Sequence, residues 1–284
     1  MQLKKLLYSG LLTLSFVTFS TNTSVAAEKS GFFKNISFNP FRDKTASVDA
    51  ETEGLRWSYL RGLEYRLKAG FNIGGIAPVP LPAEIREINS YDPTLQIAVE
   101  GDIVKWIDKR YGILLGLRFE SKGMKTDARV KNYGMKMIAE DGGMMEGYWT
   151  GNVTTDVQNS YLSIPVMGIM KLSPRWEIQA GGFFSYLMKG QFSGSVYNGY
   201  LREGDPTGNK VIFEGETTAT YDFSKDLRNI QVGAQIGAQW QAYKHLSFYT
   251  DLTWGFVPVF KSSFETITFN MYPIYANIGF AYIF

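Results

Sequence analysis

Few residues of this chain have side chains suited to covalent catalysis. Among its 284 residues there is one histidine, His245, and no cysteine, so thiol nucleophiles, thiolate metal sites and disulfides are excluded. A general base would have to be His245 or a carboxylate. The acidic residues that could form an Asp/Glu-only site are Glu140, Asp141, Glu203, Asp205, Glu214 and Glu216. His245 lies in a short connection, "YKH", between two apolar segments, which favours a turn residue over a base.

A second group of ionisable residues recurs at alternate positions of apolar segments. The group consists of Arg66, Lys68, Glu100, Arg118, Glu120 and Asp251, with Glu64, Asp102 and Glu177 at equivalent positions. Opposite charges in an interior are expected to pair with one another, because a buried charge without a partner is costly. Two roles fit such a set: ion pairs that fill an interior, which we favour, and a path for protons or ions.

Extended strands are needed to hold these charges on one side. In "GLEYRLKAGFNIGG", every second residue over 63–73 belongs to an apolar row, and Glu64, Arg66 and Lys68 belong to the other row. A period of two over this length indicates a β-strand with one apolar face. Further segments repeat the pattern, starting near residues 95, 111, 161, 176, 230, 246 and 274. Because proline cannot donate to a ladder, we expect Pro165 at a bulge or an irregular pairing.

The connections between the segments separate a membrane barrel from a soluble β-sandwich, which would also alternate. Short connections follow the second, fourth and sixth segments, and long ones follow the others, the third being roughly 40 residues long. Short periplasmic turns alternate with long external loops in outer membrane barrels, and aromatic residues gather at both interfaces. The predicted fold class is therefore all-β, a transmembrane antiparallel up-and-down β-barrel of about 8 strands. Its expected location is the outer membrane of a Gram-negative bacterium.

The N-terminal 27 residues have the features of a secretory signal peptide. Lys4 and Lys5 precede an apolar run that is too short to span a bilayer, and small residues follow it. Cleavage is predicted after Ala27, with Ala26 as the second choice, and the alternative is a buried N-terminal helix. The chain thus divides into a signal peptide (1–27), a periplasmic extension or lumen plug (28–61) and the barrel (62–284).

The charge balance limits the partners of the exported chain. Without Lys4 and Lys5, the 29 basic residues become 27, against 27 acidic ones. Binding to nucleic acid requires a basic excess on one face, so a nucleic-acid partner is not expected. No sequence feature points to a cofactor.

Several stretches resemble the PorT-like family of outer membrane β-barrels. They are "LKAGFNIGG", "YLSIPVMGIMKL" followed by "WEIQAGGFFSYLMKG", and the closing "NIGFAYIF". The resemblance covers residues 62–284, and its most specific part is Tyr-Leu-x-Ile-Pro ahead of an Ala-Gly-Gly strand. It implies an outer membrane barrel whose closing aromatic residues, Phe280, Tyr282 and Phe284, are read by the barrel-assembly machinery. One family member belongs to a protein secretion system, which adds that role as an alternative.

The expected function is a structural or surface-interaction role without catalysis. The interior of a barrel of about 8 strands is just wide enough for side chains, which disfavours a small-solute channel. Methionine and aromatic residues give adaptable contact surface, so the third connection is the predicted interaction surface, with Met144, Met145, Tyr148 and Trp149. Packing of this connection onto the barrel mouth is the alternative.

The predicted outer membrane barrel also indicates which partners and alternative functions to expect. The expected partners are outer membrane lipid and lipopolysaccharide, the assembly machinery during insertion, and secretion-system or surface proteins. The acidic residues of the external connections fit divalent cations that bridge lipopolysaccharide, or plain solvation. The alternative functions are a component of a secretion system, a small-solute channel and a lipid-modifying enzyme of the outer membrane.

Overall fold

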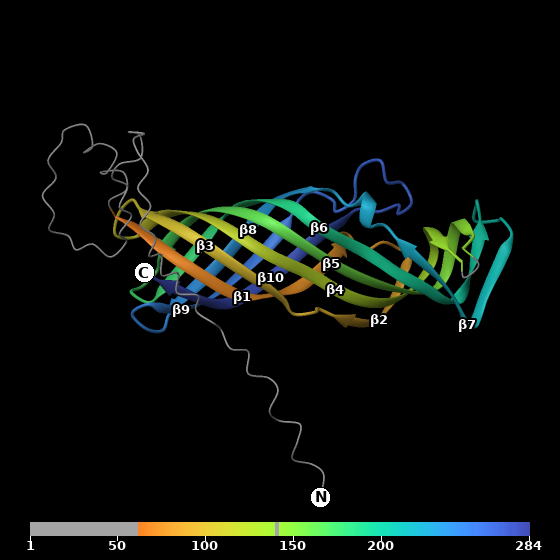
Figure 1. Cartoon of the computed structure of the whole chain (residues 1–284), viewed down its shortest axis with the longest axis horizontal. Coiled ribbons are helices and arrows are strands. Elements are labelled where there is room, and N and C mark those ends of the chain that lie inside the picture. Colours follow the sequence, from red (N-terminus) through yellow and green to blue (C-terminus); the bar gives the residue numbers. More distant parts are fainter. Residues whose placement is uncertain (1–61, 140–141) are drawn as a thin grey trace, which may run out of the picture. The chain divides into compact units, whose positions relative to one another are not determined.

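The computed structural model describes residues 62–139 and 142–284. The predicted signal peptide and the segment 28–61 lie outside the described residues. The elements are β1 (Leu63–Pro78), β2 (Ile85–Asp92), β3 (Gln96–Trp106), β4 (Tyr111–Ile138), β5 (Met144–Lys171), β6 (Trp176–Glu203), β7 (Lys210–Asp222), the 3-10 turn η1 (Ser224–Asp226), β8 (Ile230–Gln241), β9 (Leu246–Gly255) and β10 (Met271–Ile283) (Figure 1). None of the helical structure in this part of the chain is long and apolar enough to cross a membrane.

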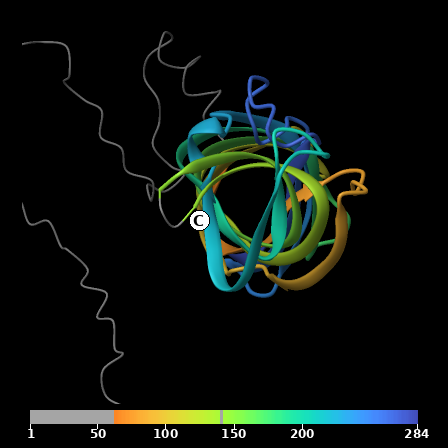
Figure 2. The same cartoon turned by 90° about the vertical axis from the view of Figure 1, so that its right-hand side faces the viewer.

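Eight strands close into a barrel. Each is antiparallel to its neighbours in the order β1, β3, β4, β5, β6, β8, β9, β10, and β10 pairs with β1 again. The other two strands lie outside this ring, β2 beside the far part of β4 and β7 beside the far part of β6. The view along the axis shows the closed wall (Figure 2). The predicted up-and-down barrel is confirmed.

Three tight turns join strands at one end of the barrel, here called the turn end. In the β3–β4 turn, Asp108 Oδ1 accepts hydrogen bonds from the backbone N–H groups of Arg110 (2.7 Å) and Tyr111 (2.6 Å). These backbone bonds, that from Tyr111 first, hold the pKa of Asp108 below its ordinary value. In the β5–β6 turn, Ser173 Oγ accepts from the N–H groups of Arg175 and Trp176. Short polar side chains thus fix both hairpins.

Pro165 lies inside the barrel on β5, facing Gly116 of β4. The β4–β5 ladder keeps its register here but lacks the pairs that Pro165 and Ile164 would make. A Cβ added to Gly116 would lie 2.8 Å from Pro165 Cγ. The expected irregular pairing is present, as an interruption of the ladder without a bulge, and glycine makes the room for the proline ring.

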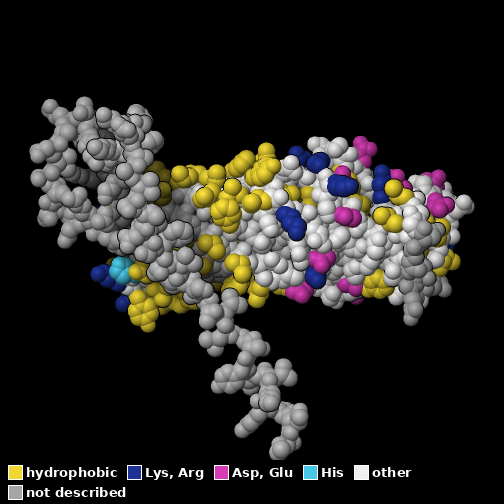
Figure 3. Space-filling model, viewed as in Figure 1, with side chains coloured by type: hydrophobic (Ala, Val, Ile, Leu, Met, Phe, Trp, Pro, Cys, Tyr) yellow, Lys and Arg dark blue, Asp and Glu magenta, His cyan; other side chains and the backbone are white. Residues whose placement is uncertain are grey.

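The outward face near the turn end is apolar. Its exposed side chains include Leu67, Phe71, Ile97, Val99, Ile103, Ile113, Leu115, Leu117, Ile178, Val232, Ile236, Leu252 and Ile278, each between 37 and 63% exposed. Hydrophobic side chains gather over this half of the molecule in Figure 3, and charged side chains gather over the other half. A soluble monomer rarely exposes so large an apolar surface, so this band fits contact with lipid.

Both faces of the wall change character at one level. On β4, the outward row changes from apolar Phe119 to polar Ser121, while the inward row changes from charged Lys122 to apolar Met124. β5 changes at the same level, because its Ser160 pairs with Ser121. Below this level the wall is apolar outside, as a membrane requires, and polar inside except for a small buried apolar cluster near the turn end, formed by Val104, Leu114, Met167 and Ile169. Above it, the wall is arranged like a water-soluble protein.

The third connection is not a loop, which corrects the sequence-based expectation. β4 and β5 continue past the lipid-facing band as one long hairpin, β6 continues beside them, and β7 pairs with β6. We call this part the extension: residues 121–138, 144–160, 187–227 and 256–270. Asn132, with φ of 57°, lies where β4 shifts register between Val130 and Tyr133. Asparagine tolerates this left-handed conformation, and the shift returns Tyr133 and Met135 to the inside.

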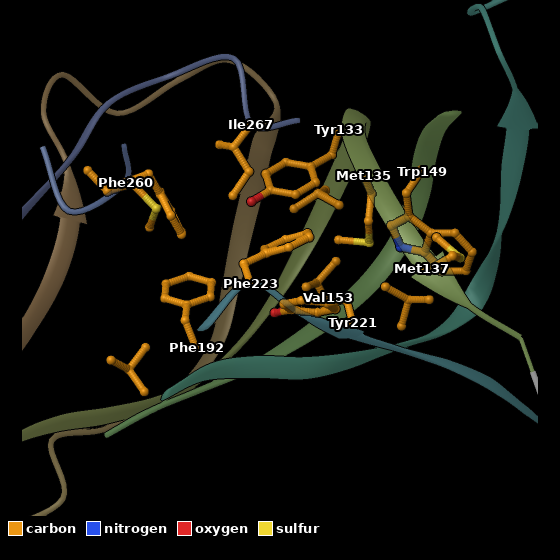
Figure 4. Close-up of a cluster of buried hydrophobic side chains, with 14 of the residues drawn as sticks. Tyr133, Met135, Met137, Trp149, Val153, Phe192, Tyr221, Phe223, Phe260 and Ile267 are labelled. Atoms are coloured by element: carbon orange, nitrogen blue, oxygen red, sulfur yellow. The ribbon is translucent and has the colours of Figure 1, made fainter. Parts of the chain in front are cut away.

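The extension has its own hydrophobic core. Its buried side chains include Tyr133, Met135, Met137, Trp149, Val153, Phe192, Phe213, Tyr221, Phe223, Phe260 and Ile267. The rings of Trp149 and Phe213 lie 5.4 Å apart, and those of Phe192 and Phe260 lie 4.9 Å apart. The side chains labelled in Figure 4 converge from β4, β5, β6, β7 and the connections into one interior. The core explains why the long hairpin stays regular beyond the membrane.

Candidate functional site

All six charges predicted for the lumen lie inside the barrel at the level of the apolar band. Arg66, Lys68, Glu100, Arg118, Glu120 and Asp251 are each no more than 4% exposed. They come from β1, β3, β4 and β9, whose inward rows meet across the narrow interior. Lys68 Nζ lies 3.2 Å from Glu100 Oε1 and 2.9 Å from Asp102 Oδ2. The buried charges therefore neutralise one another.

Arg118 is the centre of this network. Its guanidinium is ion-paired with Glu100 and lies 3.8 Å from carboxylate oxygens of both Glu120 and Asp251. It also donates to Gln235 Oε1 at 3.1 Å. One side chain thus connects strands on opposite sides of the ring, which the planar guanidinium with its five donors can do.

Lys122 completes the network and was not among the charges predicted for the lumen. It is buried, 3.0 Å from Glu120 Oε1, and its ammonium lies 5.5 to 5.6 Å from the ring centres of Tyr161, Phe183 and Tyr275. These rings separate the charged lumen from the apolar core of the extension. The signal was present, because Lys122 continues the alternation of Arg118 and Glu120, but the predicted set of lumen charges ended at Glu120 on this strand.

The network also closes the lumen toward the turn end. Arg66 pairs with Glu64 at 2.6 Å and with Glu177 at 2.8 Å, and Glu64 accepts from the Trp106 indole N–H at 3.0 Å. The side chains of Glu64 and Glu177 are 23 and 15% exposed, whereas that of Arg66 is 1% exposed. Water reaches the rim of this end but not the charges behind it.

A family comparison agrees with this geometry. The family model described as "outer membrane protein beta-barrel domain" matches residues 43–261. This chain belongs to that family. It is an integral protein of the outer membrane, its apolar band is the membrane-spanning part, and its short turns mark the periplasmic side. The match does not test the narrower resemblance to PorT-like barrels, which stays a prediction.

Solved outer membrane barrels are similar to this one at low sequence identity. Ail, the attachment invasion locus protein of Yersinia pestis, is 8% identical over 78% of this chain and 98% of its own, with a TM-score of 0.35. CarO2 of Acinetobacter baumannii is 9% identical, over 78% and 99% of the two chains, with a TM-score of 0.37. The outer membrane protease OmpT of Escherichia coli is 12% identical, over 79% and 97%, with a TM-score of 0.32. No curated protein matches the chain.

Of the predicted catalytic candidates that the structure describes, His245 does not lie near the acidic residues Glu203 and Asp205. His245 lies at the periplasmic end, where its Nδ1 is 2.7 Å from the Ile283 carbonyl oxygen and its ring stacks on Tyr282. At the other end of the molecule, the exposed Glu203 ends β6 and the exposed Asp205 lies in the connection from β6 to β7, where Asp205 accepts hydrogen bonds from Thr207. Glu140, Asp141 and the side chains of Glu214 and Glu216 lie outside the described residues. In the described part of the chain, no cluster of His, Asp or Glu could hold a metal ion.

The predicted interaction surface is divided by the strand geometry. Met144 begins β5 and is 81% exposed, whereas Met145 and Tyr148 are half-buried. Trp149 is fully buried, and its indole N–H donates to the Asn152 carbonyl oxygen at 3.2 Å. Placing Trp149 on the surface was therefore wrong, because its position on β5 points into the extension core. Of the four residues, Met144 is the one that projects freely at the tip.

The closing residues of the chain lie on the lipid side of the wall. Phe280, Tyr282 and Phe284 are 46 to 61% exposed, on the outward row of β10 and just after it. β10 pairs with β1 and so closes the barrel. Recognition of these aromatic residues by the assembly machinery stays a prediction.

Proposed function

We propose that this outer membrane barrel is a surface-contact protein: it conducts no solute, performs no catalysis, and presents the extension outside the cell as a rigid surface for other molecules. The observation that carries the proposal is the contrast inside one continuous wall. The lumen within the membrane is filled by paired charges, while β4 to β7 continue outward around a separate apolar core. The part of the wall beyond the membrane is therefore an ordered projection with a core of its own.

The filled lumen supports the exclusion of a channel. A diffusive pore needs a water-filled path, and the charges that could line one are bonded to each other across the barrel. We expect the purified protein in planar bilayers to show no stable conductance. The location of His245 at the periplasmic turns, bonded to backbone, supports the absence of acid–base catalysis at the outer rim.

The proposal is tested by crosslinking from the tip of the extension in intact cells. A photo-crosslinking amino acid replaces Met144, and in a matched control it replaces Leu115, which is 50% exposed on the lipid-facing row. The expected result is adducts with proteins or with the sugar part of lipopolysaccharide from position 144 only, whereas position 115 forms adducts with acyl chains. Protein or sugar adducts that are equally frequent at both positions, or none at position 144 together with measurable conductance, would contradict a surface-contact role.

The same experiment separates the PorT-like alternative. That alternative rests on the resemblance of the β1, β5 and β6 sequences and predicts that secretion-system subunits are the main adducts. Such adducts from periplasmic positions, for example from Tyr243, which is 73% exposed in the β8–β9 turn, would favour the secretion role over external contact.

A further inference from the structure

Just beyond the membrane-spanning band, one side of β1 has no strand ladder. β3 lies between β1 and β4, but its pairing with β1 ends at Gln96 and its pairing with β4 ends at Ala98. β1 continues to Pro78 and pairs there only with β10 among the described strands. On its free side, the Ile76 N–H is bonded to the Met124 sulfur at 3.3 Å. At this level β2 pairs with β4 but not with β1, so side chains, rather than backbone hydrogen bonds, close the wall between β1 and β2.

A pocket of about 460 Å³ occupies this place, bounded by β1, β2, β4 and β5. Its floor reaches the extension core at Tyr133, Val153 and Phe192, which are buried and point into the interior in Figure 4. Its mouth is lined by Leu81 and Ile88, which are 62 and 58% exposed. The volume lies within the roughly 300 to 1,000 Å³ of small-ligand sites. We call it the lateral pocket.

The chemistry of the lining selects an apolar ligand. No charged side chain lines the lateral pocket, and its polar side chains are the hydroxyls of Tyr91, Thr126, Tyr133 and Thr155. Tyr221 already bonds the Thr155 hydroxyl at 2.7 Å. Water is held in cavities by two to four polar partners and leaves apolar ones. A hydrocarbon chain would gain free energy here in proportion to the apolar area that it buries.

The position of the mouth indicates where such a chain comes from. Gly74, in the lining, is three residues beyond the lipid-facing Phe71, about 10 Å along the strand. The exposed Tyr91 and Leu95 continue the apolar surface from the membrane band to the mouth. A ligand dissolved in the outer leaflet therefore meets the mouth at the membrane surface. One chain of a two-chain lipid would have to bend back out of the bilayer to enter the lateral pocket while the other chain stayed in the bilayer. A single-chain amphiphile can leave the bilayer entirely.

We propose that the lateral pocket binds the hydrocarbon chain of a single-chain amphiphile of the fatty-acid class, taken from the outer leaflet. The chain lies between β1 and β4 with its methyl end near Val153 and Phe192, and the head group stays at the mouth beside Ile88. This binding is separate from contacts at the tip of the extension.

Photolabelling tests the proposal with the full-length protein refolded in vesicles. The probe is a long-chain fatty acid with a diazirine at its methyl end, and a phosphatidylcholine with the same diazirine chain is the second arm. The fatty acid is expected to label buried residues such as Met124, Val153 and Phe192, and excess unlabelled fatty acid is expected to remove this label. The phosphatidylcholine is expected to label lipid-facing residues such as Leu115 only.

A filling variant links the label to the pocket. Ala128→Phe places a ring inside the lateral pocket and is expected to abolish labelling of the buried residues, whereas Ala234→Phe, on the lipid-facing row of β8, is expected to leave it unchanged. Heat-dependent gel mobility reports whether each variant folds, and Thr126→Leu is the substitute if Ala128→Phe does not. Fatty-acid label confined to lipid-facing residues, undiminished label in a folded filling variant, or equal labelling of buried residues by phosphatidylcholine would each overturn the assignment.

Discussion

The interior of this protein has two regions that are built from the same strands and filled in opposite ways. Within the membrane, β4 directs Arg118, Glu120 and Lys122 inward, and beyond it the same strand directs Met124 and Val130 inward. The surroundings of the wall favour each filling: in lipid the apolar residues lie mainly outside and the polar ones inside, and in water the arrangement is reversed. One hairpin therefore carries two cores, one polar and one apolar, joined at the rings of Tyr161, Phe183 and Tyr275.

The largest expected effect on stability comes from removing Arg118, the central cation of the polar core. Arg118→Met leaves Glu100, Glu120 and Asp251 facing one another without their shared partner. Removing one partner of a buried ion pair costs about 3 to 5 kcal/mol, so we expect the free energy of unfolding in vesicles, measured by urea titration, to fall by that amount. Arg129→Met, at an exposed position of the extension, is the control. A loss below about 1 kcal/mol would mean that the network is dispensable.

A cavity in the apolar core is expected to destabilise the extension and to leave the membrane-spanning part of the barrel folded. Trp149→Ala removes a fully buried indole from the extension, and such truncations cost about 3 kcal/mol or more. Amide hydrogen exchange is expected to accelerate in the extension parts of β4 to β7, while β1, β8, β9 and β10 keep their protection. Trp254→Ala, at a lipid-facing residue that is 48% exposed, is the control and is expected to leave the extension protected. Faster exchange through the whole barrel would show that the two cores are a single cooperative unit.

Arginine substitutions along the outward row of β4 can locate the boundary between the membrane-spanning part and the extension. Arginine at Leu115, facing the membrane interior, is expected to cost about 2 to 4 kcal/mol, and the cost is expected to fall to about 0 to 1 kcal/mol at Ser121, beyond Phe119. Urea titrations of Leu115→Arg, Phe119→Arg and Ser121→Arg in vesicles measure this decline. Equal costs at Leu115 and Ser121 would place the membrane boundary elsewhere, because the step between Phe119 and Ser121 would then have no relation to lipid.

The sequence predicted the membrane region well and the extension poorly, for one physical reason. Alternation places Arg118 and Glu120 on the face opposite Leu117 and Phe119, and knowing that the apolar face meets lipid is enough to put the charges inside. In the extension, the pattern of Met135 and Met137 around a charged residue also alternates, but the inward face is now the apolar one.

This reversal explains two wrong predictions, one about the fold and one about the interaction surface. A continuous strand was read as a loop because its polarity changed, and Trp149 was placed on the surface for the same reason. The lateral pocket could not be predicted from alternation at all. It depends on where β3 stops pairing relative to β1 and β4, which is a property of three strands together.

The smallest expected effect is a pH dependence that belongs to the extension. Burial raises the pKa of the Tyr133 phenol above its ordinary value of 10.0, because the phenolate would lose its hydration inside the apolar core. A phenol whose pKa is higher in the folded state contributes stability that is fully present below pH 10 and declines as the pH rises above it. Hydrogen exchange in the extension, corrected for its intrinsic pH dependence, is therefore expected to accelerate above this pH.

Tyr133→Phe isolates this contribution. The variant has no phenol to ionise at this position, so its extension is expected to lose less stability above pH 10 than that of the unmodified protein, while Tyr221, whose phenol pKa is also raised by burial, continues to titrate. Tyr111→Phe, at an exposed residue of the periplasmic end, is the control and is expected to leave the alkaline response unchanged. If Tyr133→Phe responds to pH as the unmodified protein does, ionisation of Tyr133 is not the cause of the alkaline loss of stability. The polar network of the membrane region would then be the next candidate for that cause.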